Sequence, residues 1–321
     1  MRHGGGFRTF RRMSMRQGFQ RLRDVDWDPI HWARIVLTLT GRALGRLWGR
    51  DVMLYVGGVS FFAMLAIFPG VAILIGIYGL LADPGQAATQ AEFLAHLMPT
   101  GARNLFESEL QRLTETPLEA VSAQSGVALV IGGYASHRGF KALLAGLSFI
   151  HDEVSPRGFV GFNLLALVVL IAAIAMLGVF SAIFFYLRFI SAAFDLRPLA
   201  GVPWLYSEWT WASIGLTISL TLVYRYAMSS RPVAWRASIL GGFSAAVLSL
   251  AASWASAFYV EQIAHLGATY GSISAVVVFL IWLSWNVNAT FFGGALATEI
   301  EIFVGDRRRQ DVAGFISGPG S

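Results

Sequence analysis

The sequence predicts an all-α polytopic membrane protein, a six-span transmembrane helical bundle with an amphipathic N-terminal interfacial helix. Two observations predict this fold class. Of 321 residues, 55% are apolar and 13% are charged, whereas soluble domains carry about 25% charged residues. The apolar residues also gather into long segments, and a helix needs roughly 20 of them to cross the bilayer, because each residue rises about 1.5 Å through a core about 30 Å thick.

The six expected spans occupy residues 52–82, 124–150, 158–188, 208–228, 236–262 and 271–300. No charged residue occurs between Asp51 and Asp83, or between Arg157 and Arg188, so the first and third spans are well defined. The fourth is less apolar, because a glutamate and an arginine bracket only 16 uncharged residues. The second carries cations in its middle, which makes it the most unusual segment.

The segments around the spans have their own patterns. Residues 1–29 form a basic tail that we expect to be mobile, residues 83–122 an outer helical cap, and residues 305–321 a disordered C-terminal tail. In residues 30–50 four arginines, at positions 34, 42, 46 and 50, fall on a four-residue ladder beside an apolar stripe. Such a helix is suited to an anionic inner leaflet. Packing on the cytoplasmic loops of the bundle is the alternative, and the sequence leaves both open.

The basic residues predict the orientation. With the N-terminus inside, 18 Arg fall on the cytoplasmic side, four fall outside, and two cations lie within the second span. This bias follows the positive-inside rule and places both termini in the cytoplasm. Eleven of the 23 Arg precede residue 51, so the basic charge belongs to one end of the chain. We therefore expect no nucleic-acid partner.

Several motifs resemble the YihY/BrkB family of bacterial inner-membrane proteins, the virulence factor BrkB-like proteins formerly labelled ribonuclease BN-like. They are GGVSFFAMLAIFPG in the first span, ASHRGFKALLAGLSFIHDEVSPRGF in the second span and its following loop, and the last two spans with their ATYGS turn. The resemblance covers residues 45–305 in order. One departure is FFGGALATEIE at residues 291–301, which places a glycine pair and Glu299 where the family reads closer to LLGAEL.

The resemblance implies a six-span bundle in the bacterial inner (plasma) membrane, and it leaves the biochemical role open. A ribonuclease activity, serum resistance, transport and lipid handling have each been connected with such proteins. We reject the ribonuclease hypothesis for this chain, because a nuclease needs clustered carboxylates or histidines for metal binding or acid–base catalysis. The six histidines are scattered and no nucleophile-elbow motif occurs. We expect no catalytic residue, no enzymatic activity, no metal site and no cofactor.

The first candidate site is a polar stripe in the second span. Tyr134, His137, Arg138 and Lys141 follow one another at helical spacing and share one helix face. A charge at mid-bilayer costs a few kcal/mol even on lenient scales, so the cations should face water, a carboxylate or an anionic ligand. The functional interpretation is a substrate-binding site for a phosphate or carboxylate, with Arg138 as the forked donor. The structural alternative is a short or tilted span whose cations reach cytoplasmic phosphates.

Two further segments carry candidate residues. Pro69 lies inside the first span, where a proline removes a backbone hydrogen bond and can kink a helix for gating or for packing. Asn286 and Asn288 in the sixth span point to different faces, and one is expected to bond across to another helix. Glu299 and Glu301 are expected at the cytoplasmic end, where arginines could pair with them, and Glu299 is further hypothesised to balance a cation of the second span. Small residues in the fifth span, Gly241 among them, are expected to allow close helix packing.

Two functions compete. The leading hypothesis is a transporter or flippase-like translocator of an anionic, possibly lipid-linked substrate. The alternative is a non-transporting membrane scaffold or anchor that binds lipids or partners through its basic N-tail. The expected partners are lipids of the anionic inner leaflet and the anionic substrate. The sequence leaves open whether the chain forms a homo-oligomer.

Overall fold

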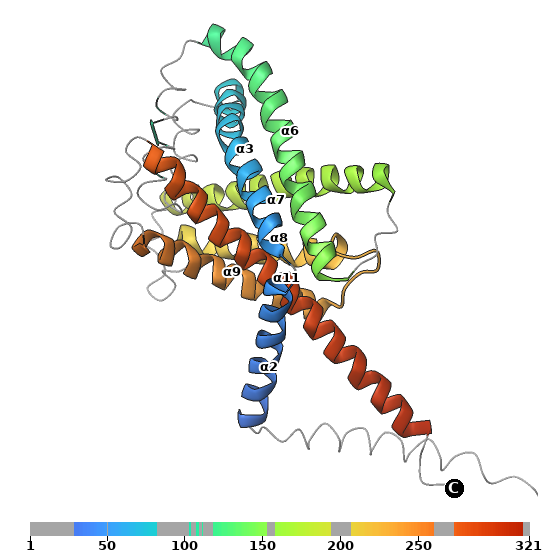
Figure 1. The fold of residues 1–321 in the computed structure, drawn as a ribbon. Coiled ribbons are helices and arrows are strands. Elements are labelled where there is room, and N and C mark those ends of the chain that lie inside the picture. Colours follow the sequence, from blue (N-terminus) through green and yellow to red (C-terminus); the bar gives the residue numbers. More distant parts are fainter. Residues whose placement is uncertain are drawn as a thin grey trace, which may run out of the picture. The chain divides into compact units, whose positions relative to one another are not determined.

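The computed structural model describes residues 29–49, 51–81, 118–152, 158–193, 207–259 and 273–316, with isolated positions between 103 and 111. Within these residues every regular element is helical, so the all-α class is confirmed (Figure 1). The helices are α2 (Pro29–Trp48), α3 (Val52–Leu81), α6 (Leu118–Ile150), α7 (Phe159–Ala193), α8 (Glu208–Tyr226), α9 (Trp235–Phe258) and α11 (Ser274–Ile316). The expected basic tail, and most of the expected outer cap, lie outside the described residues.

The chain divides into two compact units, residues 1–41 and residues 42–321, and the boundary falls within α2. The first unit contributes the N-terminal part of α2 to the described residues. The second unit contains the end of α2 and all the later helices. Every contact described below lies within the second unit.

Three helical segments in the described residues are long and apolar enough to cross a membrane. They are Phe159–Phe180 of α7, Trp235–Phe258 of α9 and Ser274–Gly305 of α11. Ala33–Trp48 and Val52–Ile67 pass the same test as a bent pair counted as one span. Membrane-type helices are therefore present, while the count of six spans and the interfacial position of α2 stay predictions.

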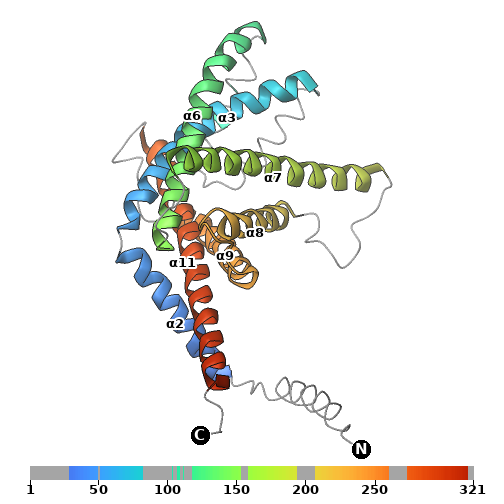
Figure 2. The ribbon, with the colours of Figure 1, turned by 90° about the vertical axis from the view of Figure 1, so that its right-hand side faces the viewer.

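The helices of the second unit associate mainly in neighbouring pairs. α3 packs against α6, α9 packs against α11, and α8 packs against α9 (Figures 1 and 2). α11 also contacts α3 and α6, so the last helix touches both pairs. Helices that lie far apart in the sequence therefore come into contact through α11.

Small residues bring α9 and α11 close together, as the spacing in the fifth span indicates. A Cβ atom at Gly241 would lie 2.6 Å from the carbonyl oxygen of Gly293, and one at Gly293 would lie 2.6 Å from the Cβ of Ala245. Neither position has room for a side chain. Since lipid tails are as apolar as leucine, such close van der Waals packing is a main source of association between membrane helices.

The core next to this contact contains Tyr224 of α8, which is fully buried. Its hydroxyl donates a hydrogen bond of 2.6 Å to the carbonyl oxygen of Thr290 on α11. A buried tyrosine hydroxyl needs such a partner, because an unpaired polar group in an apolar interior is costly. The bond ties α8 directly to α11.

The C-terminal end differs from the sequence expectation. α11 continues to Ile316, so it includes most of the segment expected to be disordered from residue 305. Residues 306–313 contain neither glycine nor proline, and a helix that is already nucleated extends readily through such a stretch. The predicted membrane span ended before these residues because they are charged, but charged residues alone do not end a helix.

Candidate functional site

The polar stripe of α6 lies away from the helix face that packs on α3. Gly132 and Gly139 form the packing face: a Cβ at Gly132 would lie 2.7 Å from the Cβ of Pro69, and one at Gly139 would lie 3.4 Å from the Cβ of Phe62. At about 3.6 residues per turn, the stripe residues fall on the remaining circumference. Tyr134 and Arg138 are accordingly exposed.

Aromatic rings lie beneath the two cations of the stripe. The guanidinium carbon of Arg138 is 5.6 Å from the centroid of the Tyr134 ring and 5.8 Å from that of Phe62. The Nζ atom of Lys141 is 5.4 Å from the centroid of the Phe159 ring at the start of α7. A ring face attracts a cation but neutralises no charge. In the described part of the chain neither cation forms an ion pair, so no described carboxylate neutralises either charge.

His137 is separated from this arrangement by a contact of its own. Its Nε2 atom lies 3.1 Å from the carbonyl oxygen of Asn163, so the ring is directed at α7. The structure thus leaves Tyr134 and Arg138 exposed and in contact with each other, half-buries Lys141 against Phe159 of α7, and gives His137 a contact between helices. The helical spacing of the four residues could not distinguish these two settings.

Pro69 makes a close packing contact with α6. It lies inside α3, which continues as one helix from Val52 to Leu81. Its ring packs where Gly132 of α6 leaves room, at the distance given above. The described contact is therefore a packing contact, and a gating role for Pro69 stays a prediction.

A second polar cluster centres on Arg46, near the end of α2, and sequence reasoning missed it as a site. Its Nε atom donates to Oε1 of Glu299 on α11. One terminal nitrogen donates to Oδ2 of Asp152 at 2.8 Å and to the carbonyl oxygen of Ile150 at 3.1 Å, both at the end of α6. Arg46 and Glu299 are largely buried, with side-chain exposures of 17% and 7%. One guanidinium therefore joins three helices.

The hypothesis that Glu299 balances a cation of the second span is wrong for its direct contacts, because Arg46 is its ion-pair partner. Glu299 lies beside the C-terminal end of α6, next to residues 150–152, whereas Arg138 lies three turns earlier along that helix. Arg46 is separated from Glu299 by 253 residues, so no spacing rule could pair them. The available signal was the arginine ladder of residues 30–50, one member of which is oriented inward.

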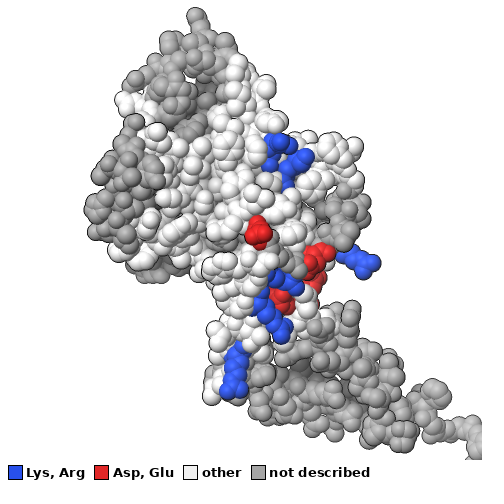
Figure 3. Space-filling view, in the orientation of Figure 1, with Lys and Arg blue, Asp and Glu red and all other residues white. Residues whose placement is uncertain are grey.

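Further hydrogen bonds surround Arg46 and Glu299. The Nδ1 atom of His151 is 2.9 Å from the hydroxyl of Thr298, and its Nε2 atom is 3.8 Å from Oε2 of Glu301. The backbone N–H of Ala234, just before α9, donates to Glu301 at 3.4 Å. On the face shown in Figure 3, the charged side chains of the described residues gather in a few places. The cluster links α6, α9 and α11 to α2 at one end of the bundle.

The two asparagines of α11 serve different contacts. Asn286 donates to the carbonyl oxygen of Trp282 at 2.9 Å and to the hydroxyl of Ser253 on α9 at 3.4 Å. Trp282 also donates to Ser253, at 3.0 Å, so one serine receives two bonds across the interface. Asn288 donates to Ser284 in its own helix and lines a groove. Asn286 thus makes the contact between helices expected of one of the pair.

Among the residues that the structure describes, no three His, Asp or Glu side chains form a group that could hold a metal ion. The Arg46 cluster contains three carboxylates, but its polar atoms are directed at the guanidinium, the imidazole and backbone groups. Its arrangement is that of an interhelical clamp.

Comparisons with known proteins identify the family. The chain is 22% identical to a UPF0761 membrane protein of Janthinobacterium sp. (strain Marseille) over 87% of this chain and 62% of that protein. It is 31% identical to UPF0761 membrane proteins of Paraburkholderia xenovorans, over 29% of this chain and 22% of that protein, and of Alcanivorax borkumensis, over 35% and 24%. The chain thus spans less than two thirds of the length of these relatives.

No solved structure matches the chain. The sequence profile of the family described as virulence factor BrkB matches residues 43–313. The match includes α3 to α9 entirely and nearly all of α11, so it includes the α6 stripe and the Arg46 cluster. The chain is therefore a membrane protein that belongs to the virulence factor BrkB family.

Proposed function

We propose that the protein is a translocator of anionic amphiphiles in the bacterial inner membrane, with both termini in the cytoplasm. The α6 stripe binds the anionic headgroup. The observation that carries the proposal is the pair of cations, Arg138 and Lys141, which lie on aromatic rings and have no carboxylate partner among the described residues. The proposal contains no chemical step, so the protein is not an enzyme in this scheme.

The chemistry of the stripe suits a phosphate or carboxylate. The planar guanidinium of Arg138 can donate two parallel hydrogen bonds, and the ammonium of Lys141 adds a second charge one turn later on the same face. The Tyr134 ring holds the guanidinium from below at 5.6 Å. A charge in hydrocarbon costs a few kcal/mol, and a bound anionic headgroup offsets part of that cost.

The exposure of the stripe favours an amphiphile over a small soluble anion. Tyr134 is 59% exposed, and Arg138 lies beside it on the outer surface of the α3–α6 pair. A substrate with an acyl or polyprenyl tail keeps the tail in the bilayer while its headgroup moves along this surface. A closed aqueous pore is not required for such movement.

The competing function is a membrane scaffold that anchors partners or lipids through the basic N-tail. It is supported by the tight association of α9 and α11 at Gly241 and Gly293, and by the Arg46 cluster, which holds α2, α6 and α11 together. Both features make a rigid bundle. They are equally compatible with a rigid frame beside a moving substrate, so the test must measure movement directly.

The test uses proteoliposomes that contain fluorescent anionic or zwitterionic lipid analogues, with transbilayer movement measured by chemical quenching of the outer leaflet. Arg138→Gln with Lys141→Gln should slow movement of the anionic analogue by about tenfold or more, since a hydrogen bond to a charged group contributes about 1.5–3 kcal/mol. The matched control is Arg231→Gln with Arg236→Gln, which removes two exposed arginines elsewhere.

The control variant should retain the wild-type rate. If the wild-type protein moves no anionic analogue, or if the stripe variant moves it at the wild-type rate, the translocator proposal fails. In the first case the scaffold function takes its place. Equal loss of anionic and zwitterionic movement would also contradict the assignment of the stripe to an anionic headgroup.

A further inference from the structure

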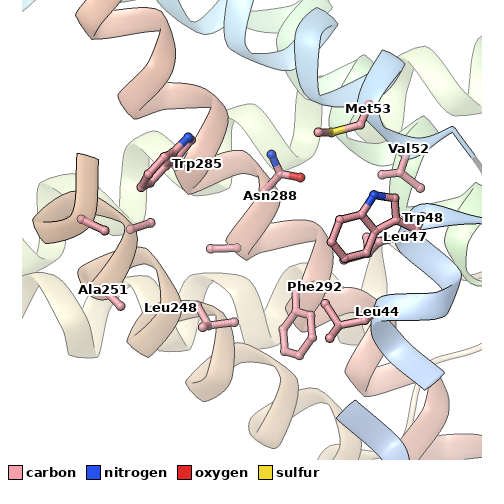
Figure 4. A pocket seen from close by; sticks show the side chains of 13 residues that line it. Leu44, Leu47, Trp48, Val52, Met53, Leu248, Ala251, Trp285, Asn288 and Phe292 are labelled. Atoms are coloured by element: carbon pink, nitrogen blue, oxygen red, sulfur yellow. The ribbon is translucent and has the colours of Figure 1, made fainter. Parts of the chain in front are cut away.

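An apolar groove of about 460 Å³ lies where the end of α2, the start of α3, α9 and α11 meet (Figure 4). Its walls include Leu44, Trp48, Leu248, Ala251, Trp285 and Phe292. Among the lining residues that the structure describes, no side chain is charged and Asn288 is the one amide. The Asn288 side-chain nitrogen already donates to the carbonyl oxygen of Ser284 at 2.8 Å. The groove therefore offers almost nothing to water.

The position of the groove indicates which solvent it meets. α9 and α11 are two of the three helical segments that can cross the membrane, and both contribute to the walls. Leu248 on α9 and Trp48 on α2 are exposed at its edges. Because we expect α9 and α11 to cross the membrane, we expect the groove to open toward the hydrocarbon of the bilayer. Apolar cavities stay dry, and an empty groove would lose the dispersion contacts of its lining atoms.

The volume of the groove limits what can occupy it. An α-helix is about 10–12 Å wide with its side chains and rises about 5.4 Å per turn, so the groove holds only about one turn of helix. A partner helix would need a trough along most of a span. A volume of about 460 Å³ instead falls within the roughly 300–1,000 Å³ of sites for small molecules.

We infer that this groove binds one acyl chain of a membrane phospholipid. The chain lies between Trp48 and Trp285, against Leu248 and Phe292, and below the amide of Asn288 (Figure 4). Hydrocarbon is the only abundant ligand that matches an uncharged, dry groove open to the bilayer. The groove shares no residue with the α6 stripe, so the inference is independent of the proposed translocation.

Binding in this groove should be detectable as lipid that stays on the protein after transfer from the bilayer to detergent. In a bilayer an acyl chain is surrounded by apolar groups both among other lipids and in the groove. Its binding is therefore favoured only by its van der Waals packing against the helices. When detergent replaces the bilayer, free lipids disperse, and a chain seated between helices leaves more slowly than annular lipid. Filling the groove with a side chain should abolish this difference.

The test reconstitutes the full chain with a single phospholipid, transfers it stepwise into detergent and counts retained lipids by native mass spectrometry. The wild-type protein should retain one lipid per chain. Ala252→Phe and Ala255→Phe, which fill the groove, should reduce retained lipid at least about fivefold. Ala175→Phe places the same ring at an exposed alanine of α7 and should behave as the wild type.

A second measurement covers the case in which a filled variant folds poorly. The chain has no cysteine, so Trp254→Cys, at an exposed position of α9 outside the groove lining, and Ala175→Cys can each carry one fluorophore. Brominated acyl chains should quench both labels in vesicles, and after transfer to detergent only the label at position 254 should stay quenched. The inference is overturned if no lipid is retained, if filled variants retain as much as the wild type, if both labels lose quenching together, or if the groove is covered by a second copy of the chain.

Discussion

Replacing Glu299 with glutamine removes the carboxylate that faces Arg46 and leaves a guanidinium that is 17% exposed with one buried partner fewer. Breaking a buried ion pair from one side destabilises a protein by about 3–5 kcal/mol, because a charge is left uncompensated. Arg46 keeps Asp152 at 2.8 Å, whose side chain is 55% exposed, and an exposed pair contributes about 0–1 kcal/mol. We therefore expect Glu299→Gln to cost about 3 kcal/mol.

The double variant distinguishes pairing from general damage. Arg46→Gln alone should cost a similar amount, because it leaves Glu299 buried without its cation. The two changes together should cost less than their sum by about 1–3 kcal/mol, the coupling typical of residues in direct contact. Arg138→Gln combined with Glu299→Gln should be additive within about 0.5 kcal/mol, since these residues share no contact.

The free energy of unfolding can be measured by titrating SDS into mixed micelles and following helicity by circular dichroism. Additive costs for Arg46 and Glu299, or coupling between Arg138 and Glu299 above about 1 kcal/mol, would refute the reasoning. The second outcome would restore the balance between Glu299 and the second span that the sequence first indicated.

Two further predictions test the packing of α11. Gly293→Val should destabilise the bundle by about 1–3 kcal/mol, because its Cβ would lie 2.6 Å from that of Ala245; Gly126→Ala, with open space around the new atom, should be neutral or stabilising in the same SDS titration. Tyr224→Phe should cost about 0.6–1.7 kcal/mol through loss of the bond to Thr290. A thermal unfolding midpoint equal to the wild type would show that this bond contributes nothing.

The residues by themselves determined where most helices run. The charge-free stretch from Asp51 to Asp83 predicted a span of 52–82, and α3 occupies Val52–Leu81. The prediction of 158–188 agrees with α7 in its start and falls short of its end at Ala193. Such agreement is expected, because a long apolar run is a local property of the sequence. Helix continuation past a charge, as in α11, depends on backbone propensity and not on hydropathy.

Side-chain partners belong to the tertiary structure. Helical spacing predicted that Tyr134, Arg138 and Lys141 share one side of α6; in the structure Arg138 lies against the Tyr134 ring, and half-buried Lys141 lies against Phe159 of α7. The same spacing could not show that His137 is directed at Asn163 of α7. Intrahelical neighbours follow from a period of 3.6 residues, whereas the partner across an interface follows from how two helices pack.

Arg46 illustrates the limit most clearly. Its sequence pattern, a ladder of arginines spaced four or eight residues apart, describes the surface of an amphipathic helix. Its partners lie 106 and 253 residues further along the chain. Apolar pattern and charge bias are local sums, so the sequence determined the membrane class, the helices and the cationic face. Ion pairs, close glycine contacts and the apolar groove require residues distant in sequence to meet, and only the packed helices decided them.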